Sequence, residues 1–176
     1  MQHLEPQVIK KIPKGTILLR AGENSHGLFR VMKGCLKSYV VDKAGKEHIV
    51  YFAPEDWIIS DMDSILNGHP ASVTIETIED SEVGFVPRNN LREIQHLSPT
   101  DLAEMNLKLL KHTIAINKRL IGLLSYTAEE RYKQFTETYP TLVQRLPLKL
   151  IASFIGITPE YLSSIRHKLA KQPRKA

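Results

Sequence analysis

The C-terminal segment constrains the fold of this chain most strongly, because two short apolar-patterned stretches flank a single glycine there. From Leu148 the sequence reads LKLIASFIGITPEYLSSIRHKLAK, which predicts two amphipathic helices joined by a tight turn. Gly156 ends the first helix, since glycine adopts the left-handed conformation of a helix C-terminus without Cβ strain. Thr158 can cap the second helix, whose first turn accommodates Pro159. Ala152 is small enough for the two helices to cross closely.

This pair of helices has the pattern of a helix-turn-helix, the motif whose second helix enters the major groove of double-stranded DNA. The predicted buried face consists of Ile151, Ile155, Ile157, Leu162, Ile165 and Leu169. The candidate DNA-binding residues lie beside that face and are Lys149, Thr158, Pro159, Glu160, Tyr161, Ser163, Ser164, Arg166, His167 and Lys168. Side chains of these types suit base edges and phosphates. An ordinary helical hairpin shows the same apolar spacing, so a second indication is needed.

The distribution of charge supplies that indication. Residues 1–97 hold 11 Lys and Arg against 13 Asp and Glu, whereas residues 98–176 hold 13 against 6. From Arg145 onward, Glu160 is the only acidic residue in the sequence. A basic segment that coincides with a helix pair around a glycine turn is the electrostatic pattern of a protein that binds the phosphate backbone.

The N-terminal half has a different pattern, with many short strand-like runs separated by turn residues. The predicted strands are residues 16–19, 28–32, 36–41, 47–52, 73–78 and 82–86. The loop between the third and fourth runs contains Gly45, where a positive φ is expected. Strands of this number and spacing indicate a β-sandwich or a jelly roll (double-stranded β-helix) over residues 1–97, and with the helices that follow they predict an α+β fold.

After the predicted strands the pattern becomes helical. Ser98 is the candidate cap of a long helix over residues 98–125, and a helix-turn-helix domain over residues 126–176 follows. One apolar stripe of the long helix holds Leu102, Met105, Leu109, Ile116, Leu120 and Leu123, and a second holds Leu110, Ile114, Ile121 and Leu124. Two stripes require two partners. We expect the chain's own β domain to cover one stripe and the same helix of a second subunit the other, giving a homodimer. The alternative is a monomer with one wide core-facing stripe.

This layout resembles the Crp/Fnr family of bacterial transcription regulators, and in particular its short Bacteroidetes-type members. The resemblance is carried by Lys14-Gly15, Ala21-Gly22-Glu23, residues 31–36, residues 78–83, residues 128–132 and residues 147–169. It implies a jelly roll that senses a small-molecule effector, dimerisation through the long helix, and DNA binding by the second helix of the helix-turn-helix. RNA polymerase is a further partner that the resemblance implies. The helical segment that usually begins such members is not evident, as a truncated start would explain.

The resemblance also implies where an effector would bind. Members that bind cyclic nucleotides use a phosphate cassette, Gly-Glu followed by Arg-Ser-Ala. On this chain the cassette makes Ser60, Asp61, Met62, Ala71, Ser72 and Val73 the effector pocket candidates. Ala71 replaces the Arg that pairs with the cyclic phosphate, and a buried phosphate without such a partner is costly. We therefore expect that cyclic AMP does not bind in the usual way, and that the effector is a different molecule or is absent.

The base-reading positions depart from the family pattern as well. In well-studied members these positions hold Arg or Ser, then Glu, then Ser or Gly followed by Arg. The matching residues here are Pro159, Glu160, Ser163 and Ser164. Glu160 keeps the role of acceptor for a cytosine amino group, whereas Ser164 replaces the Arg that forks onto guanine. The resemblance thus predicts entry into the major groove but no particular operator sequence.

Other classes of protein fit the sequence less well. A metal-dependent enzyme on a jelly roll needs clustered histidines, and no two of the seven histidines have a His-x-His spacing. Cys35 is the only cysteine, so no internal disulfide forms, and an iron–sulfur cluster, which needs about four ligands, is excluded. No apolar run reaches the length of about 18 residues that a membrane span requires. We expect a cytoplasmic non-enzyme with no metal and no cofactor. A ligand-independent regulator, and a ligand- or partner-binding module with a degenerate DNA-binding region, remain open alternatives.

Overall fold

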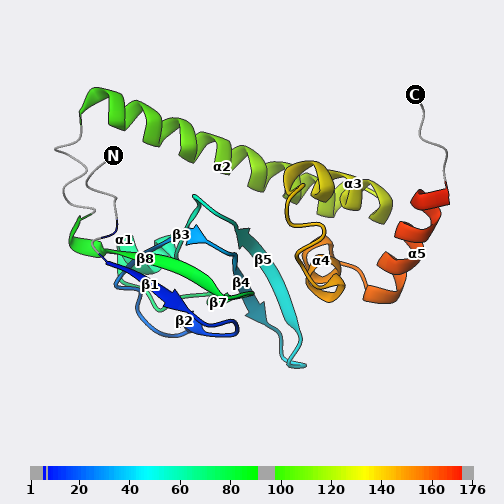
Figure 1. Cartoon of the computed structure of the whole chain (residues 1–176), viewed down its shortest axis with the longest axis horizontal. Coiled ribbons are helices and arrows are strands. Elements are labelled where there is room, and N and C mark those ends of the chain that lie inside the picture. Colours follow the sequence, from blue (N-terminus) through cyan, green and yellow to red (C-terminus); the bar gives the residue numbers. More distant parts are fainter. Residues whose placement is uncertain (1–5, 7, 91–97, 172–176) are drawn as a thin grey trace. The chain divides into compact units, whose positions relative to one another are not determined.

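The computed structural model describes residue 6 and residues 8–90 and 98–171. The chain divides into two compact units, Met1–Lys108 and Leu109–Ala176. The boundary lies within the long helix α2 (Pro99–Ser125), so the two units share one continuous helix (Figure 1). This helix matches the predicted range of residues 98–125 closely, and the Leu102 amide donates to the Ser98 carbonyl at its start. The division into three domains stays a prediction.

The first unit contains two four-stranded antiparallel sheets, in the orders β1-β8-β3-β6 and β2-β7-β4-β5. The strands are β1 (Val8–Ile12), β2 (Ile17–Leu19), β3 (Gly27–Lys33), β4 (Leu36–Val41), β5 (Glu47–Ala53), β6 (Ile58–Ile59), β7 (Thr74–Thr77) and β8 (Ser81–Pro87). Strands from the two ends of the domain pair in both sheets, β1 with β8 and β2 with β7. This nesting confirms the predicted jelly roll. Two strands, β1 and β6, and the short helix α1 (Met62–Asn67) were not among the predicted elements.

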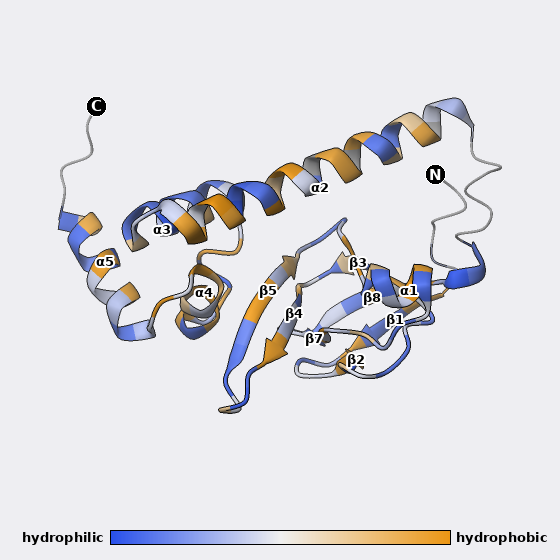
Figure 2. Cartoon of the chain, turned by 180° about the vertical axis from the view of Figure 1, so that it is seen from behind, coloured by the Kyte–Doolittle hydropathy of each residue, from blue (hydrophilic) through white to orange (hydrophobic). Residues whose placement is uncertain are grey.

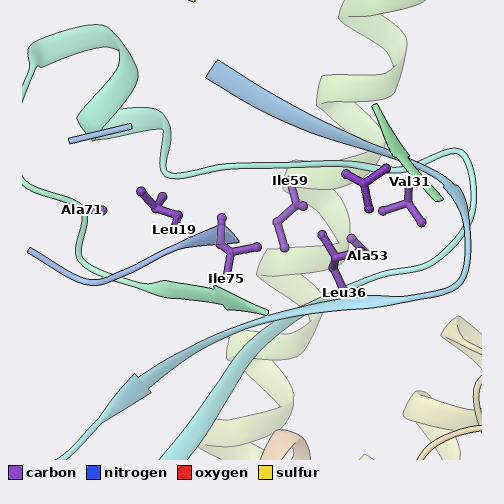
Figure 3. Close-up of a cluster of buried hydrophobic side chains, with 8 residues drawn as sticks. Leu19, Val31, Leu36, Ala53, Ile59, Ala71 and Ile75 are labelled. Carbon is purple, nitrogen blue, oxygen red and sulfur yellow. The ribbon is translucent and has the colours of Figure 1, made fainter. Parts of the chain in front are cut away.

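The core of the jelly roll lies between the two sheets, where alternate residues of each strand point inward. Val31 faces Val83 across one sheet, and Leu36 faces Ala53 across the other. The buried cluster is made of Leu19, Val31, Leu36, Ala53, Ile59, Ala71, Ile75 and Val83 (Figure 3). This packing brings Ala71, a residue of the predicted cassette, into the hydrophobic core.

A buried charge lies on the sheet that contains β4. Lys37 Nζ lies 2.7 Å from Glu47 Oε2 and 3.4 Å from Glu76 Oε2, and it also sits 4.2 Å from the centroid of the Tyr39 ring. Burial, followed by the hydrogen bond with Glu76, raises the pKa of Tyr39 to about 12. Two carboxylates and an aromatic face therefore compensate the desolvated ammonium, as a buried cation requires.

The second unit contains the C-terminal part of α2 and three further helices, α3 (Ala128–Thr138), α4 (Leu148–Ile155) and α5 (Pro159–Lys171). Thr127 and Glu130 form the predicted capping box at the start of α3, where the Glu130 amide donates to Thr127 Oγ1 and the Thr127 amide donates to Glu130 Oε2. The helix ends at Thr138, immediately before Tyr139 and Pro140, as predicted. Helix α3 packs against both α4 and α5, and α4 and α5 also pack against each other.

Candidate DNA-binding and effector sites

Helices α4 and α5 form the predicted helix-turn-helix. Gly156 has a φ of +72° and ends α4, and its amide donates to the carbonyls of Ala152 and Ser153. At the start of α5, which begins at Pro159, Thr158 Oγ1 accepts from the Tyr161 amide at 3.2 Å. The two local signals found in the sequence, a left-handed glycine and a hydroxyl cap, thus form as expected.

The buried face of this hairpin is also close to the predicted one. Ala152, Ile151 and Leu162 are completely buried, and Ile155 and Ile165 are nearly so. Ile157 and Leu169 are half-buried. Because the apolar side chains all point toward the other helices of the second unit, the opposite side of α5 is left to solvent.

The exposed side of α5 carries most of the predicted DNA-binding residues, whereas Lys149 belongs to α4 and Thr158 precedes α5. Exposed in this structure are Lys149, Thr158, Glu160, Tyr161, Ser163, Ser164, Arg166, His167 and Lys168, while Pro159 is half-buried. The Ser164 hydroxyl donates to the Glu160 carbonyl at 3.2 Å, so this side chain bonds to its own helix. The outward face therefore presents one carboxylate near the start of α5 and cations further along.

One of these residues has a partner that sequence reasoning missed. Lys168 Nζ lies 2.8 Å from Glu129 Oε2, and Glu129 also pairs with Lys133 at 3.1 Å. The hydrogen bond with Glu129 raises the pKa of Lys168, and the bond with Lys168 in turn lowers the pKa of Glu129. Lys168 thus links α5 to α3 within the chain, and its contact with a phosphate stays a prediction.

The effector pocket candidates come together around the carboxylate of Asp61. Asp61 caps α1, and its Oδ1 accepts from the Ser64 amide at 3.0 Å. Its Oδ2 accepts from both the amide and the hydroxyl of Ser72, each at 2.8 Å. Asp61 is only 6% exposed. The two halves of the predicted cassette are therefore joined by the chain's own hydrogen bonds, and both carboxylate oxygens already have donors.

The other cassette residues are also engaged or turned outward. Ala71 is buried, and its amide and carbonyl pair with the backbone of Glu23 and Gly22. The Ser60 hydroxyl donates to the Gly27 carbonyl at 2.8 Å. Val73 is half-buried against the core, whereas Met62 is 48% exposed at the start of α1.

The environment of Asp61 has a consequence for stability. Burial alone would raise the pKa of this carboxyl, but the hydrogen bonds from Ser64 and Ser72 together outweigh burial and hold the pKa below its ordinary value. A carboxyl whose pKa is lower in the folded than in the unfolded state stabilises the fold above its unfolded pKa, and this contribution is lost as the pH falls through the folded pKa.

We expect Asp61→Asn to destabilise the first unit by about 1–3 kcal/mol at pH 7, because buried donors lose a charged acceptor. This difference in the free energy of unfolding should begin to shrink below about pH 4 and continue to shrink as the pH falls toward the lowered folded pKa, because protonation removes the advantage of the carboxylate. Urea unfolding followed by circular dichroism at pH 7 and pH 3.5 measures this. Asp63→Asn is the matched control, since the exposed Asp63 bonds only to exposed partners and should matter little. An equal loss of unfolding free energy at pH 7 and pH 3.5 would contradict a stabilising role for the Asp61 carboxylate.

A separate hollow of about 580 Å³ opens in the first unit beside Leu19, Phe29 and Phe85, next to the turn that contains Glu23 and His26. None of the six cassette candidates lines it. The sequence contained no signal for this hollow, because its walls come from strands distant in the chain.

Among the described residues, no group of three His, Cys, Asp or Glu side chains is placed to hold a metal ion. Over the same residues, no helix combines the length and the apolar character that crossing a membrane requires.

Comparison with known proteins supports both parts of the fold. Residues 9–96 match the family model of the cyclic nucleotide-binding domain. The anaerobic regulatory protein of Pasteurella multocida (strain Pm70) is 27% identical over 176 residues, which covers 92% of this chain and 63% of the relative. The fumarate and nitrate reduction regulatory protein (Fnr) of Escherichia coli (strain K12) is 31% identical over 127 residues, covering 72% and 50%. The chain thus spans between half and two thirds of the length of these relatives.

A solved structure extends the likeness to the whole arrangement of elements. The structure of FixK2 from Bradyrhizobium japonicum matches with a TM-score of 0.75 over 94% of this chain and 85% of that chain. At 20% sequence identity this match shows the fold alone. Jelly roll, long helix and C-terminal helix-turn-helix therefore occur together, in this order, in a known protein.

Proposed function

We propose that this chain, which belongs to the Crp/Fnr family and carries its cyclic nucleotide-binding domain, is a dimeric regulator that binds double-stranded DNA in the cytoplasm. The observation that carries the proposal is the helix-turn-helix of α4 and α5, whose exposed face is polar and basic. The names of the relatives, both regulatory proteins, support it. A regulator of this kind acts through RNA polymerase and performs no catalysis itself.

The proposed dimer rests on the exposed apolar residues of α2. In the first predicted stripe, Leu109, Ile116 and Leu120 are each about half exposed, and Leu123 is 38% exposed. Leu102 and Met105 of the same stripe are partly buried. The second stripe is also exposed, and Figure 2 shows hydrophobic residues recurring along the helix. A contiguous apolar surface of this kind marks an interaction site.

A second copy of the chain is the occupant that fits this surface. Two α2 helices packed about a two-fold axis bury the same leucines and isoleucines on both sides, as an isologous interface requires. The same symmetry presents two copies of α5 to one duplex, and DNA accepts both when they are about 34 Å apart. How the two stripes divide between the chain's own β domain and a second subunit stays a prediction.

The cassette residues bear on which effector this chain binds. Asp61 accepts hydrogen bonds from Ser64 and Ser72, and Ala71 provides no cation for a phosphate. We therefore propose that cyclic AMP does not bind there and that the effector is another small molecule. Ligand-independent regulation is the second candidate function, and the closed Asp61–Ser72 contact favours it.

Calorimetric titration with cyclic AMP and cyclic GMP should show no binding at micromolar concentration. Low-micromolar binding of either nucleotide would overturn this part.

The experiment that tests the function is selection of bound duplexes from a random DNA pool by the purified chain, with and without a metabolite extract. We expect enrichment of a sequence with two-fold symmetry, because the dimer presents two identical helices. The affinity should fall with salt at a log–log slope of roughly −7, on the assumption that each subunit contacts about four phosphates. A pool that remains random at low salt would contradict DNA binding.

Two substitutions separate base recognition from phosphate contact. Glu160→Ala should relax the preference at one base pair of each half-site by about 1–3 kcal/mol, since in the proposed complex its carboxylate accepts a hydrogen bond from a base. Lys149→Ala should weaken binding to every sequence alike and reduce the salt slope by about 1 per subunit. Fluorescence anisotropy on the selected duplex and on single-base variants measures both. Glu137→Ala removes an exposed acid from α3 and is the control. Unchanged base preference in Glu160→Ala would refute the orientation assigned to α5.

A further inference from the structure

A guanidinium from α2 holds the end of the first helix of the helix-turn-helix. Arg119 Nη2 donates to the Phe154 carbonyl at 2.9 Å. The guanidinium carbon also lies 4.1 Å from the centroid of the Phe154 ring. A single residue of α2 thus contacts both the backbone and the side chain of one residue near the end of α4.

Phe154 lies at the C-terminal end of α4, where a cationic hydrogen-bond donor stabilises the helix. Phe154 is the last but one residue of α4, and the carbonyls of a last helical turn have no intrahelical donor. The same end of a helix carries partial negative charge, yet the last turn of α4 contains no basic residue of its own. Arg119 supplies the missing cation from another helix. Burial lowers the pKa of Arg119, but an arginine keeps its charge in a protein. The hydrogen bond is therefore charge-assisted.

Neighbouring contacts extend this link to the turn and to α3. A Cβ on Gly156 would lie 3.4 Å from Leu123 Cδ2, so the residue one helical turn beyond Arg119 packs against the glycine turn. From α3, Gln134 Nε2 donates to the Lys118 carbonyl at 3.3 Å and Arg131 Nη1 to the Leu123 carbonyl at 3.5 Å. The face of α2 that carries Arg119 and Leu123, the last residue of the first apolar stripe, is thus joined to α3 and to the helix pair α4 and α5, which we call the recognition hairpin.

We propose that Arg119 is a positioning residue that sets the angle between α2 and the recognition hairpin, and so the separation at which a dimer presents its two α5 helices. This inference rests on the proposed function, since it requires α2 to dimerise and α5 to enter the major groove. Arg119 acts through α4. A change of one base pair moves a half-site by about 3.4 Å along the duplex, so a small rotation of the hairpin changes the preferred spacing.

The test uses the full chain and two sets of duplexes. One set carries both selected half-sites with spacings that differ by one base pair at a time, and the other carries a single half-site. We expect Arg119→Met, which can still pack on Phe154 but cannot donate, to lose about tenfold in affinity at the preferred spacing. Its affinity for a single half-site should change by less than about threefold, because the exposed face of α5 is untouched. Arg119→Lys keeps a charged donor and should lie between the wild type and Arg119→Met. Lys118→Met removes the neighbouring exposed cation and should behave as the wild type.

The outcomes separate this inference from the function on which it rests. Flattened or shifted spacing preference with retained half-site binding and an unchanged dimer mass supports the positioning role. Equal weakening on all duplexes, or no change at all, overturns it. If Arg119→Met does not fold, Arg119→Lys decides, since a spacing preference weakened by about threefold supports the inference and an unchanged one overturns it. A wild type that prefers one spacing while its Arg119 variants keep that preference refutes the inference alone. A wild type that binds no duplex refutes the proposed function and the inference with it.

Discussion

Leu120→Glu will convert the proposed dimer into a monomer while leaving the chain folded. Leu120 is 53% exposed in the single chain, so glutamate at this position remains solvated and costs the monomer little. In a two-fold dimer the same substitution brings two carboxylates into an apolar contact between the α2 helices, where each unpaired charge costs several kcal/mol. Sedimentation equilibrium at micromolar concentration should give a mass near 20.0 kDa for the variant and twice that for the wild type.

The loss of the dimer should also appear in DNA binding. A monomer contacts one half-site at a time, so it loses the gain from joining two binding sites, and affinity for the selected duplex should fall by about 100-fold or more. Lys118→Glu introduces the same residue outside the apolar stripes of α2 and is the matched control. A Leu120→Glu variant that stays dimeric would show that the interface lies elsewhere.

Phe135→Ala will reduce the free energy of unfolding of the second unit by about 3–5 kcal/mol, the range for removing a buried aromatic ring. Phe135 is 2% exposed, and its ring centroid lies 5.5 Å from that of Tyr139 and 5.6 Å from that of Phe154. Tyr139 and Phe154 also meet edge to face at 5.8 Å, so the three rings form one cluster between α3 and α4. Alanine leaves a cavity in the middle of this cluster.

Urea unfolding followed by circular dichroism and by DNA binding measures the effect. We expect the binding transition of Phe135→Ala to move to lower urea concentration, because α4 loses the ring that packs against Phe154. Tyr161→Ala is the control for the circular dichroism transition alone, since Tyr161 is itself a candidate DNA-binding residue. It removes a ring of similar size that is 56% exposed on α5 and should change stability by less than about 0.5 kcal/mol. A loss below 1 kcal/mol in Phe135→Ala would contradict the role of the cluster.

The parts of the fold that sequence reasoning predicted correctly are those with strong local signals. Gly156, Thr158 and the capping box of Thr127 and Glu130 act within a few residues, and each formed as expected. The missed strand β1 gave no such signal. Val8 to Lys11 are all exposed, so the run has no alternation of buried and exposed residues, and its partner β8 lies at the other end of the domain. Helix α1 was missed because it is short, although Asp61 and Gly68 are recognisable caps.

The candidate sites show the same division between local and distant contacts. The exposed face of α5 followed from helical spacing alone. The hydrogen bonds from Ser72 to Asp61 join residues 11 positions apart, and the resemblance to a known cassette brought the two segments together without revealing that they bond to each other. The contacts of Lys168 with Glu129 and of Arg119 with Phe154 span 39 and 35 positions. Nothing in the sequence pairs such residues, because their meeting depends on how the helices pack.

The mass of the complex with DNA is the most direct test of the central claim, that two copies of the chain place their α5 helices on one duplex. Mass photometry or sedimentation of the purified chain with the selected symmetric duplex, at low salt, measures it. The account predicts two chains of 20.0 kDa per duplex, and one chain on a duplex that carries a single half-site. The absence of any complex, or a single chain on the symmetric duplex at saturating protein, would contradict it.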